Sequence, residues 1–211
     1  IPHEIKMAKF KNGTRADIID RKNSYNTLID LMEDVRLFFS RNTKTSSVVV
    51  GMDRIDLNEY PFEVVREAIV NAVAHRDYKI NSSPITFYIY DNRIEITSPG
   101  KLIPPLTIAT LESANPLHRN KIICDIFSKT GYMEHYGTGI SRMKKTMLEE
   151  GLKEPKFEEM GEFFKVTLWA RDENTIDPEL YKNNRNPLDK LGLNERQIKA
   201  FALMVNENKT F

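Results

Sequence analysis

Three residues whose side chains can bind ligands or take part in catalysis recur at every fourth position: Glu67, Asn71 and His75. In a helix this spacing places the three side chains on one stripe. A carboxylate and an amide on such a stripe can together orient a water molecule and supply an oxygen ligand to Mg²⁺. The same spacing is common on the solvated edge of an ordinary helix. Two interpretations therefore stay open, a ligand site and a plain helix edge.

Short motifs elsewhere in the chain could meet the same ligand. Gly137-Thr138-Gly139 precedes a predicted helix, where glycine lets the backbone approach an anion and free N–H groups point at it. Arg119 could pair with a phosphate. Ser98-Pro99-Gly100 ends a predicted strand, and ligands of open α/β sheets favour such strand ends. The alternatives are a tight turn, a surface arginine and a simple strand stop.

The stripe must be carried by a helix that begins at Pro61, because proline suits the first helical turn and apolar residues then recur at helical spacing. We expect about four turns, with the stripe bordering the apolar face. Residues 84–90 and 93–97 alternate around Asp91-Asn92 and predict a hairpin. Residues 107–120 predict short helices and loop. The other predicted elements are helices at 24–41 (Ser24 as N-cap), 121–129 and 138–150 (Thr138 as N-cap, Gly151 as C-cap), and strands at 5–10, 46–52 and 163–169.

Composition excludes several classes of protein. The 211 residues carry a formal net charge of +1, so no global basic field attracts nucleic acid, and DNA contact would need a local patch. The single cysteine, Cys124, excludes an intrachain disulfide, and its spacing from His118 and His135 gives no structural zinc site. No apolar run approaches the roughly 18 residues of a membrane helix, and no signal peptide is visible, so we expect a cytoplasmic protein.

Taken together and in order, five segments resemble one family: residues 67–78, 91–100, 119–120, 137–143 and 151–157. The resemblance is to the GHKL-type ATPase domain of proteins labelled RecG-related helicases or transcriptional regulators, and it spans about residues 1–170. It implies a two-layer α/β sandwich in which helices cover one face of a mixed sheet, as in the GHKL (Bergerat) fold. No P-loop motif is present, so a helicase motor is not expected.

The resemblance also implies roles for individual residues. Glu67 would activate the attacking water and Asn71 would hold Mg²⁺. The other candidate nucleotide-binding residues are His75, Ser98, Gly100, Arg119, Gly137, Thr138 and Gly139, of which His75 has no fixed role in the wider superfamily. In the wider superfamily an Asp recognises the adenine amino group, whereas Ser98 occupies that position here, and Leu102 stands where a second glycine is usual. A hydroxyl can accept the same hydrogen bond only without charge. His75 either lines the pocket or is a hydrogen-bonded structural histidine.

These expectations lead to a domain plan and two hypotheses of function. Residues 1–170 would form the ATPase-like domain, 171–190 a linker and 191–211 the start of a winged helix, whose missing part would contact DNA. In the first hypothesis the chain is an ATP-binding regulatory module of a transcriptional regulator. Hydrolysis of ATP with Mg²⁺ is then possible but would be slow, and binding orders a lid at 109–139. In the alternative it is a non-enzymatic scaffold or homodimerisation module that binds no nucleotide.

Overall fold

The fold is described from a computed structural model, in which residues 4–50, 53–133 and 137–171 are described. The chain divides into two units, residues 1–46 with 57–173 and residues 47–56 with 174–211. The predicted linker at 171–190, from residue 172 onward, and the predicted start of a winged helix at 191–211 lie outside the described residues.

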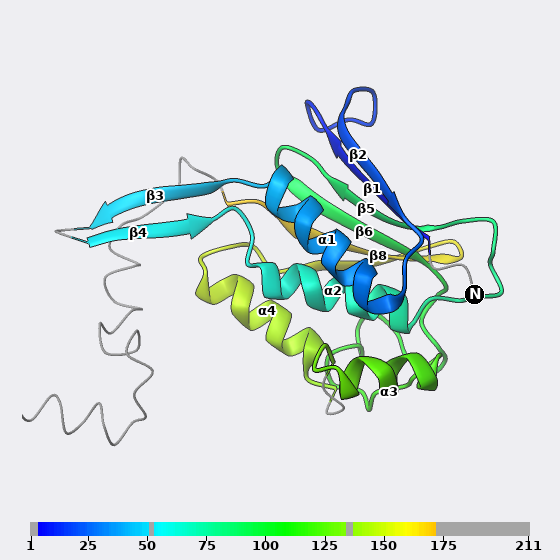
Figure 1. The fold of residues 1–211 in the computed structure, drawn as a ribbon. Coiled ribbons are helices and arrows are strands. Elements are labelled where there is room, and N and C mark those ends of the chain that lie inside the picture. The colour runs from blue at the N-terminus through cyan, green and yellow to red at the C-terminus, as the bar shows by residue number, and fades with distance from the viewer. Residues whose placement is uncertain (1–3, 51–52, 134–136, 172–211) are drawn as a thin grey trace, which may run out of the picture. The chain divides into compact units, whose positions relative to one another are not determined.

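A six-stranded mixed sheet forms one layer of the first unit (Figure 1). β1 runs parallel to β5, and the other neighbouring pairs in this sheet are antiparallel. In β5 every second side chain is buried, which is the alternation expected of a sheet with one face on the core. The strand order is β2 (Ile18–Ser24), β1 (Ile5–Phe10), β5 (Ile85–Ile89), β6 (Arg93–Pro99), β8 (Phe163–Trp169) and β7 (Lys156–Met160).

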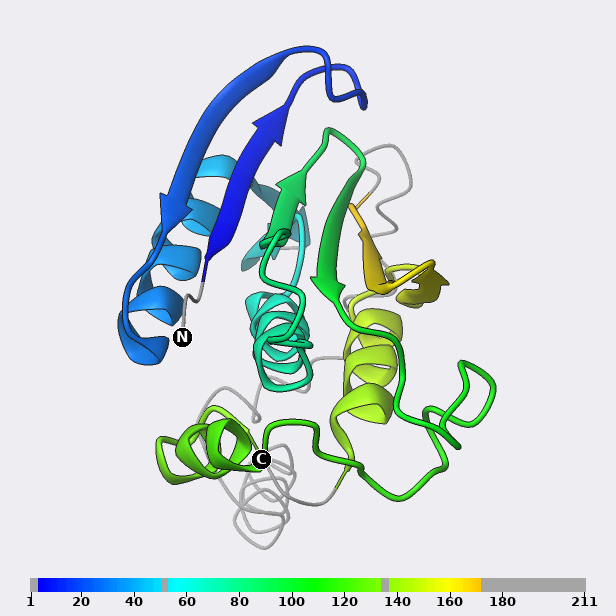
Figure 2. The same ribbon diagram turned by 90° about the vertical axis from the view of Figure 1, so that its right-hand side faces the viewer.

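The second layer consists of helices that cover one face of the sheet, as the sequence predicts. α1 (Leu28–Asn42), α2 (Phe62–Ala74) and α4 (Gly139–Glu149) lie across that face with α2 in the middle (Figure 2). α2 is buried along most of its length and belongs to the main apolar core. None of the helices in the described part of the chain has the length and apolar character needed to cross a membrane.

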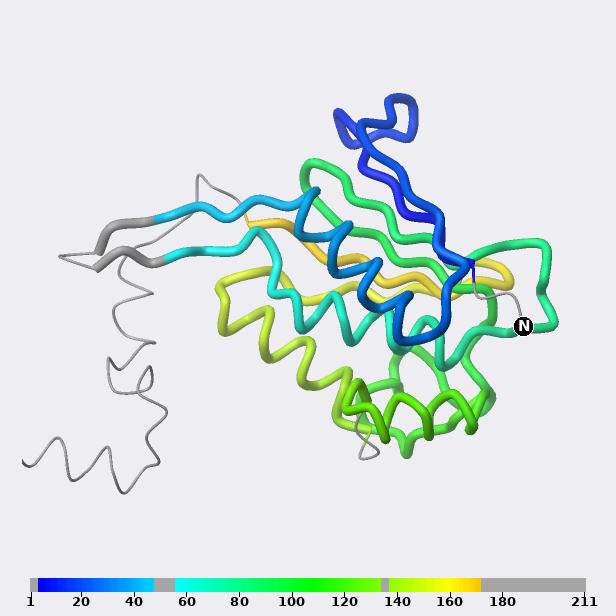
Figure 3. The backbone as a smooth tube through the Cα atoms, in the orientation of Figure 1, coloured from blue at the N-terminus to red at the C-terminus, as the bar shows by residue number. Residues whose placement is uncertain are grey.

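A long segment without helix or strand connects β6 to α3 (Lys121–Lys129), and Figure 3 follows it past the carboxyl end of α2. Asn120 fastens the end of this segment to α2. Its Nδ2 donates hydrogen bonds to the carbonyl oxygens of Ala74 (3.0 Å) and Arg76 (2.8 Å). These carbonyls lie at and just beyond the end of α2, where no helical N–H can reach them. The contact therefore places the segment against the helix that carries Glu67.

Two kinds of local prediction were wrong or incomplete. Ser24 does not cap α1: it ends β2 and donates a hydrogen bond to Asp34, whereas Thr27 caps the helix by accepting from the N–H of Asp30. The strands β2 and β7 were not predicted, because both are polar edge strands that become strands by pairing with β1 and β8. The predicted strand at 46–52 is β3 (Thr45–Val50), which pairs with an unpredicted strand, β4 (Asp53–Asn58).

Candidate functional site

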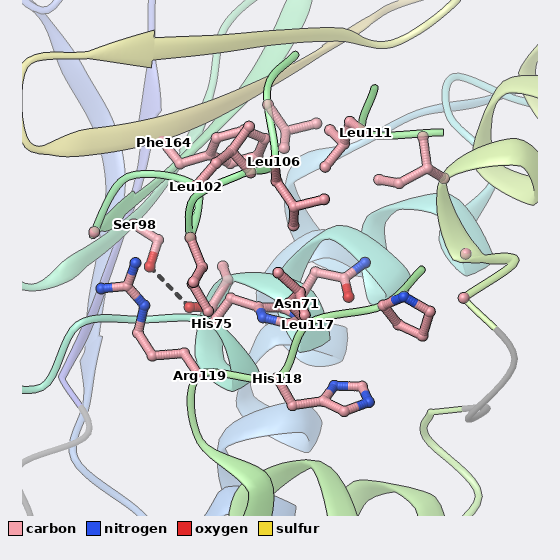
Figure 4. A pocket seen from close by; sticks show the side chains of 18 of the residues that line it. Asn71, His75, Ser98, Leu102, Leu106, Leu111, Leu117, His118, Arg119 and Phe164 are labelled. Atoms are coloured by element: carbon pink, nitrogen blue, oxygen red, sulfur yellow. Dashed lines mark hydrogen bonds between the residues drawn. The ribbon is translucent and has the colours of Figure 1, made fainter. Parts of the chain in front are cut away.

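A cavity of about 160 Å³ opens beside α2 in the first unit (Figure 4). Its walls are α2, the end of β6, the segment that follows β6 and the start of α4. The structure thereby brings together nearly all the predicted site residues, because the residues lining the cavity include Glu67, Asn71, His75, Ser98, Gly100, Arg119, Gly137 and Gly139. Thr138 is exposed at the N-cap of α4 and does not line the cavity.

The Glu67 carboxylate is buried and is held by two donors. Its side chain is 7% exposed. Oε1 accepts a hydrogen bond from Asn71 Nδ2 at 3.1 Å, and Oε2 accepts one from Arg142 Nη2 at 3.0 Å. The bond to Asn71 confirms that the i, i+4 spacing brings these side chains together. Among the described residues no hydrogen bond to the Asn71 Oδ1 is present, so this oxygen is available to a ligand.

Glycine is required where α4 approaches this carboxylate. A Cβ atom added at Gly139, the first residue of α4, would collide with Glu67 Oε1. Gly100 is equally constrained, because it has a φ of +117° and an added Cβ would lie 2.9 Å from the backbone nitrogen of Asp77. The two glycines therefore let separate chain segments close around one cavity.

Ser98 and Arg119 line the cavity, and their hydrogen bonds also join the segments that form its walls. The Ser98 hydroxyl donates a hydrogen bond to the carbonyl oxygen of Ala72 at 2.8 Å, which joins β6 to α2 (Figure 4). Arg119 Nη1 donates to Asp77 Oδ2 at 2.9 Å, and the Asp77 N–H donates to the carbonyl of Pro99. A phosphate contact by Arg119 would therefore compete with its bond to Asp77.

His75 follows α2 and faces the cavity. Its ring stacks on that of His118 with 6.0 Å between centroids and 21° between planes. Burial, together with the nearby His118 and Arg119, lowers the pKa of His75 to about 4. The ring is thus neutral at pH 7. Within the described ranges it makes no hydrogen bond, which favours the pocket-lining interpretation over a structural histidine that is already hydrogen-bonded.

The sequence analysis missed the apolar wall of the cavity and one charged residue beside it. The wall comes from the segment after β6 and from strands β6 and β8, and it includes Ile96, Leu102, Leu106, Leu111, Leu117 and Phe164. Leucines recurring in an otherwise polar loop were the available signal. The missed charged residue is Arg142. Its position in the first turn of the helix after the glycines was a weaker signal.

Metal binding can be tested against the donors present. The described residues contain no group of three or more His, Cys, Asp or Glu side chains that could hold a metal ion. Mg²⁺ does not need such a cage, since it is commonly held by one or two protein oxygens together with substrate phosphates and water. The available Asn71 Oδ1 in the cavity wall fits that arrangement.

Comparisons with known proteins support an ATPase-like domain. Residues 82–168 match the family described as "Putative ATP-dependent DNA helicase recG C-terminal". The matched segment contains Ser98, Gly100, Arg119 and the Gly137–Gly139 turn, and it begins after α2. No curated protein matches the chain.

A solved structure shares the fold. The crystal structure of the DIP2311 protein from Corynebacterium diphtheriae is similar with a TM-score of 0.72 and 25% sequence identity. The similarity covers 79% of this chain and 34% of that protein's chain, so the present chain spans about a third of that protein's length.

The contact between Gly139 and Glu67 predicts a non-additive pair of substitutions. Gly139→Ala should lower the thermal midpoint Tm of the wild-type protein, because the new methyl group meets the carboxylate. In a Glu67→Ala background the same change should be neutral or stabilising by up to about 1 kcal/mol, since alanine favours a helix over glycine. Thermal unfolding of the four proteins followed by circular dichroism measures both effects. Equal destabilisation in both backgrounds would contradict the contact.

The partly buried His75 predicts a pH dependence of stability. Its pKa is about 4 in the folded protein, whereas an unfolded histidine titrates near 6.5, so the unfolded state binds more protons between these values. The free energy of unfolding should therefore fall by about 2 kcal/mol from pH 7 to pH 5 through this residue. Urea unfolding at both pH values should show that loss reduced in His75→Asn and retained in His118→Asn. Identical pH profiles for all three proteins would contradict it.

Proposed function

We propose that the cavity binds an adenine nucleotide with Mg²⁺ and that the chain is the nucleotide-binding module of a transcriptional regulator. The observation that carries the proposal is the meeting of Glu67, Asn71 and the turn at Gly137–Gly139 in one cavity. The match of residues 82–168 to an ATPase family is a second support, and it includes the Gly137–Gly139 turn but not α2.

Each part of the cavity suits one part of the ligand. The leucine-rich wall would cover the base, since apolar surfaces pack well against planar rings. Gly137 and Gly139 would let the backbone at the start of α4 approach the phosphates. Asn71 Oδ1 would ligate Mg²⁺. The bound ion would neutralise part of the phosphate charge.

Hydrolysis would use Glu67 as the general base. Its carboxylate would accept a proton from the water that attacks the terminal phosphorus, and the products would be ADP and inorganic phosphate. We expect slow turnover because a Glu67 oxygen already accepts a hydrogen bond from its helix neighbour Asn71, which makes the carboxylate a weaker base. A regulatory role needs only slow turnover, since a nucleotide can act by shifting a population of conformations.

The proposed regulatory output lies beyond the described residues. Residues 191–211 would begin a winged helix joined to the ATPase-like domain by a linker at 171–190. DNA contact would then come from that winged helix. Nucleotide binding and ordering of the segment 109–139 would be coupled to the arrangement of the DNA-binding part.

A scaffold without nucleotide is the second candidate. Ser98 favours the scaffold. Its hydroxyl replaces the usual adenine-binding carboxylate, and it already donates a hydrogen bond to the carbonyl oxygen of Ala72. β2 favours it as well: this strand lies at the edge of the sheet and exposes Ile18 and Ile19 at 52% and 59%. An open edge of this kind can pair with a second copy of the chain, giving a homodimer.

A thermal-shift titration separates the two candidates. Mg²⁺–ATP at 100 times its Kd should stabilise the protein by about 2.7 kcal/mol, because the ligand binds only the native state. GTP should give a smaller shift. Asn71→Ala should lose most of the shift seen with ATP, whereas Asn81→Ala, in an exposed loop, should keep it. The absence of a shift at millimolar nucleotide would favour the scaffold.

Glu67 can be tested separately from binding. Glu67→Ala should bind ATP at least as tightly as the wild type and lose hydrolysis by about 100-fold or more, the contribution expected of a general base. Phosphate release at saturating Mg²⁺–ATP measures turnover, and calorimetry measures affinity. Turnover equal to that of the wild type would remove Glu67 from the mechanism.

A further inference from the structure

Arg142 is a charged group that faces Glu67 and has no role in the site described so far. It lies in the first turn of α4, three residues after Gly139. Its Nη2 donates to Glu67 Oε2 at 3.0 Å. The exposed fractions of the two side chains differ, at 41% for Arg142 and 7% for Glu67. The guanidinium thus reaches from a half-exposed position to a buried carboxylate.

The ion pair compensates the buried charge of Glu67. A buried carboxylate is costly unless a cation or hydrogen-bond donors compensate its charge. Asn71 supplies a neutral donor, and Arg142 supplies the positive charge in the ion pair with Glu67. The same carboxylate fills the space in front of Gly139, at the amino end of α4. Glu67 therefore lies where the proposed function puts a phosphate.

A nucleotide would change this balance. A terminal phosphate near Gly137 and Gly139 would bring further negative charge next to Glu67, and two adjacent anions repel each other unless a cation lies between them. Arg142 is already beside Glu67, and a guanidinium pairs well with phosphate because its donors match two oxygens at once. The terminal phosphate thus becomes a competing partner for Arg142.

The structure leaves room for this exchange. A second, polar cavity of about 260 Å³ lies beside Glu67, and its lining includes Arg142, Arg66, Glu63 and Thr146. Glu67 lines both cavities, while Arg142 lines only the second. The guanidinium is therefore separated from the nucleotide cavity by one carboxylate side chain. Movement of that side chain off Arg142 would expose the guanidinium to the first cavity and leave the carboxylate facing it.

We propose that Arg142 is a nucleotide-binding residue that contacts the terminal phosphate, and that Glu67 holds its guanidinium while the site is empty. The inference rests on the proposed nucleotide binding. It adds that the protein distinguishes ATP from ADP through this one arginine. Phosphate binding by Arg142 also releases Glu67 to face the attacking water, so binding of the correct nucleotide and availability of the base are linked.

Calorimetric titrations with AMP, ADP and the non-hydrolysable ATP analogue AMP-PNP, all with Mg²⁺, test the proposal. The wild type should bind AMP-PNP more tightly than ADP. Arg142→Gln should weaken AMP-PNP binding by about tenfold, the factor of one charge-assisted hydrogen bond, and change ADP and AMP binding much less. Arg142→Lys should keep part of the preference and serves as the second variant if Arg142→Gln folds poorly. Lys145→Gln removes a charge from an exposed position of the same helix and should change nothing.

The outcomes separate this inference from the proposed function. Equal weakening of all three nucleotides in Arg142→Gln, or an unchanged preference for AMP-PNP over ADP, would overturn the role of Arg142 and leave nucleotide binding intact. Absence of binding of any nucleotide to the wild type would overturn the proposed function and this inference together.

Discussion

A buried negative charge on α2 constrains the structure around it. Glu67 lies on a helix that is otherwise largely apolar on its inner side, and its carboxylate needs donors wherever the packing puts it. Asn71 meets it from the same helix and Arg142 from α4. α4 can come this close only because its first residue, Gly139, has no side chain. The position of one carboxylate thus requires glycine at the first residue of a helix that begins more than seventy residues later in the chain.

The cavity has a polar side and an apolar side because different segments of the chain meet at α2. The polar stripe of Glu67, Asn71 and His75 forms one side, and the leucines after β6 form another. Those leucines are held in place by polar contacts of the loop itself: Arg119 pairs with Asp77, and Asn120 binds the end of α2. An apolar wall opposite a polar stripe suits a ligand with a flat ring at one end and charges at the other.

Periodicity in the sequence predicted the parts of this site that are local. The spacing along α2 gave the stripe, and alternation around Asp91-Asn92 gave the hairpin of β5 and β6. The edge strands β2 and β7 escaped prediction because their pairing partners, and not their own residues, make them strands. The bond from Ser98 to Ala72 and the ion pair from Arg142 to Glu67 join residues 26 and 75 positions apart, so no local pattern could indicate them.

Amide hydrogen exchange with and without Mg²⁺–ATP tests the central claim most directly, because it reports where on the chain a ligand acts. We predict slower exchange in two places: the start of α4 from Gly139 onward, and the loop that carries Leu102 and Leu106. Exchange in β2 should stay unchanged. Protection confined to β2, or no protection anywhere at saturating nucleotide, would contradict the assignment of this cavity to a nucleotide.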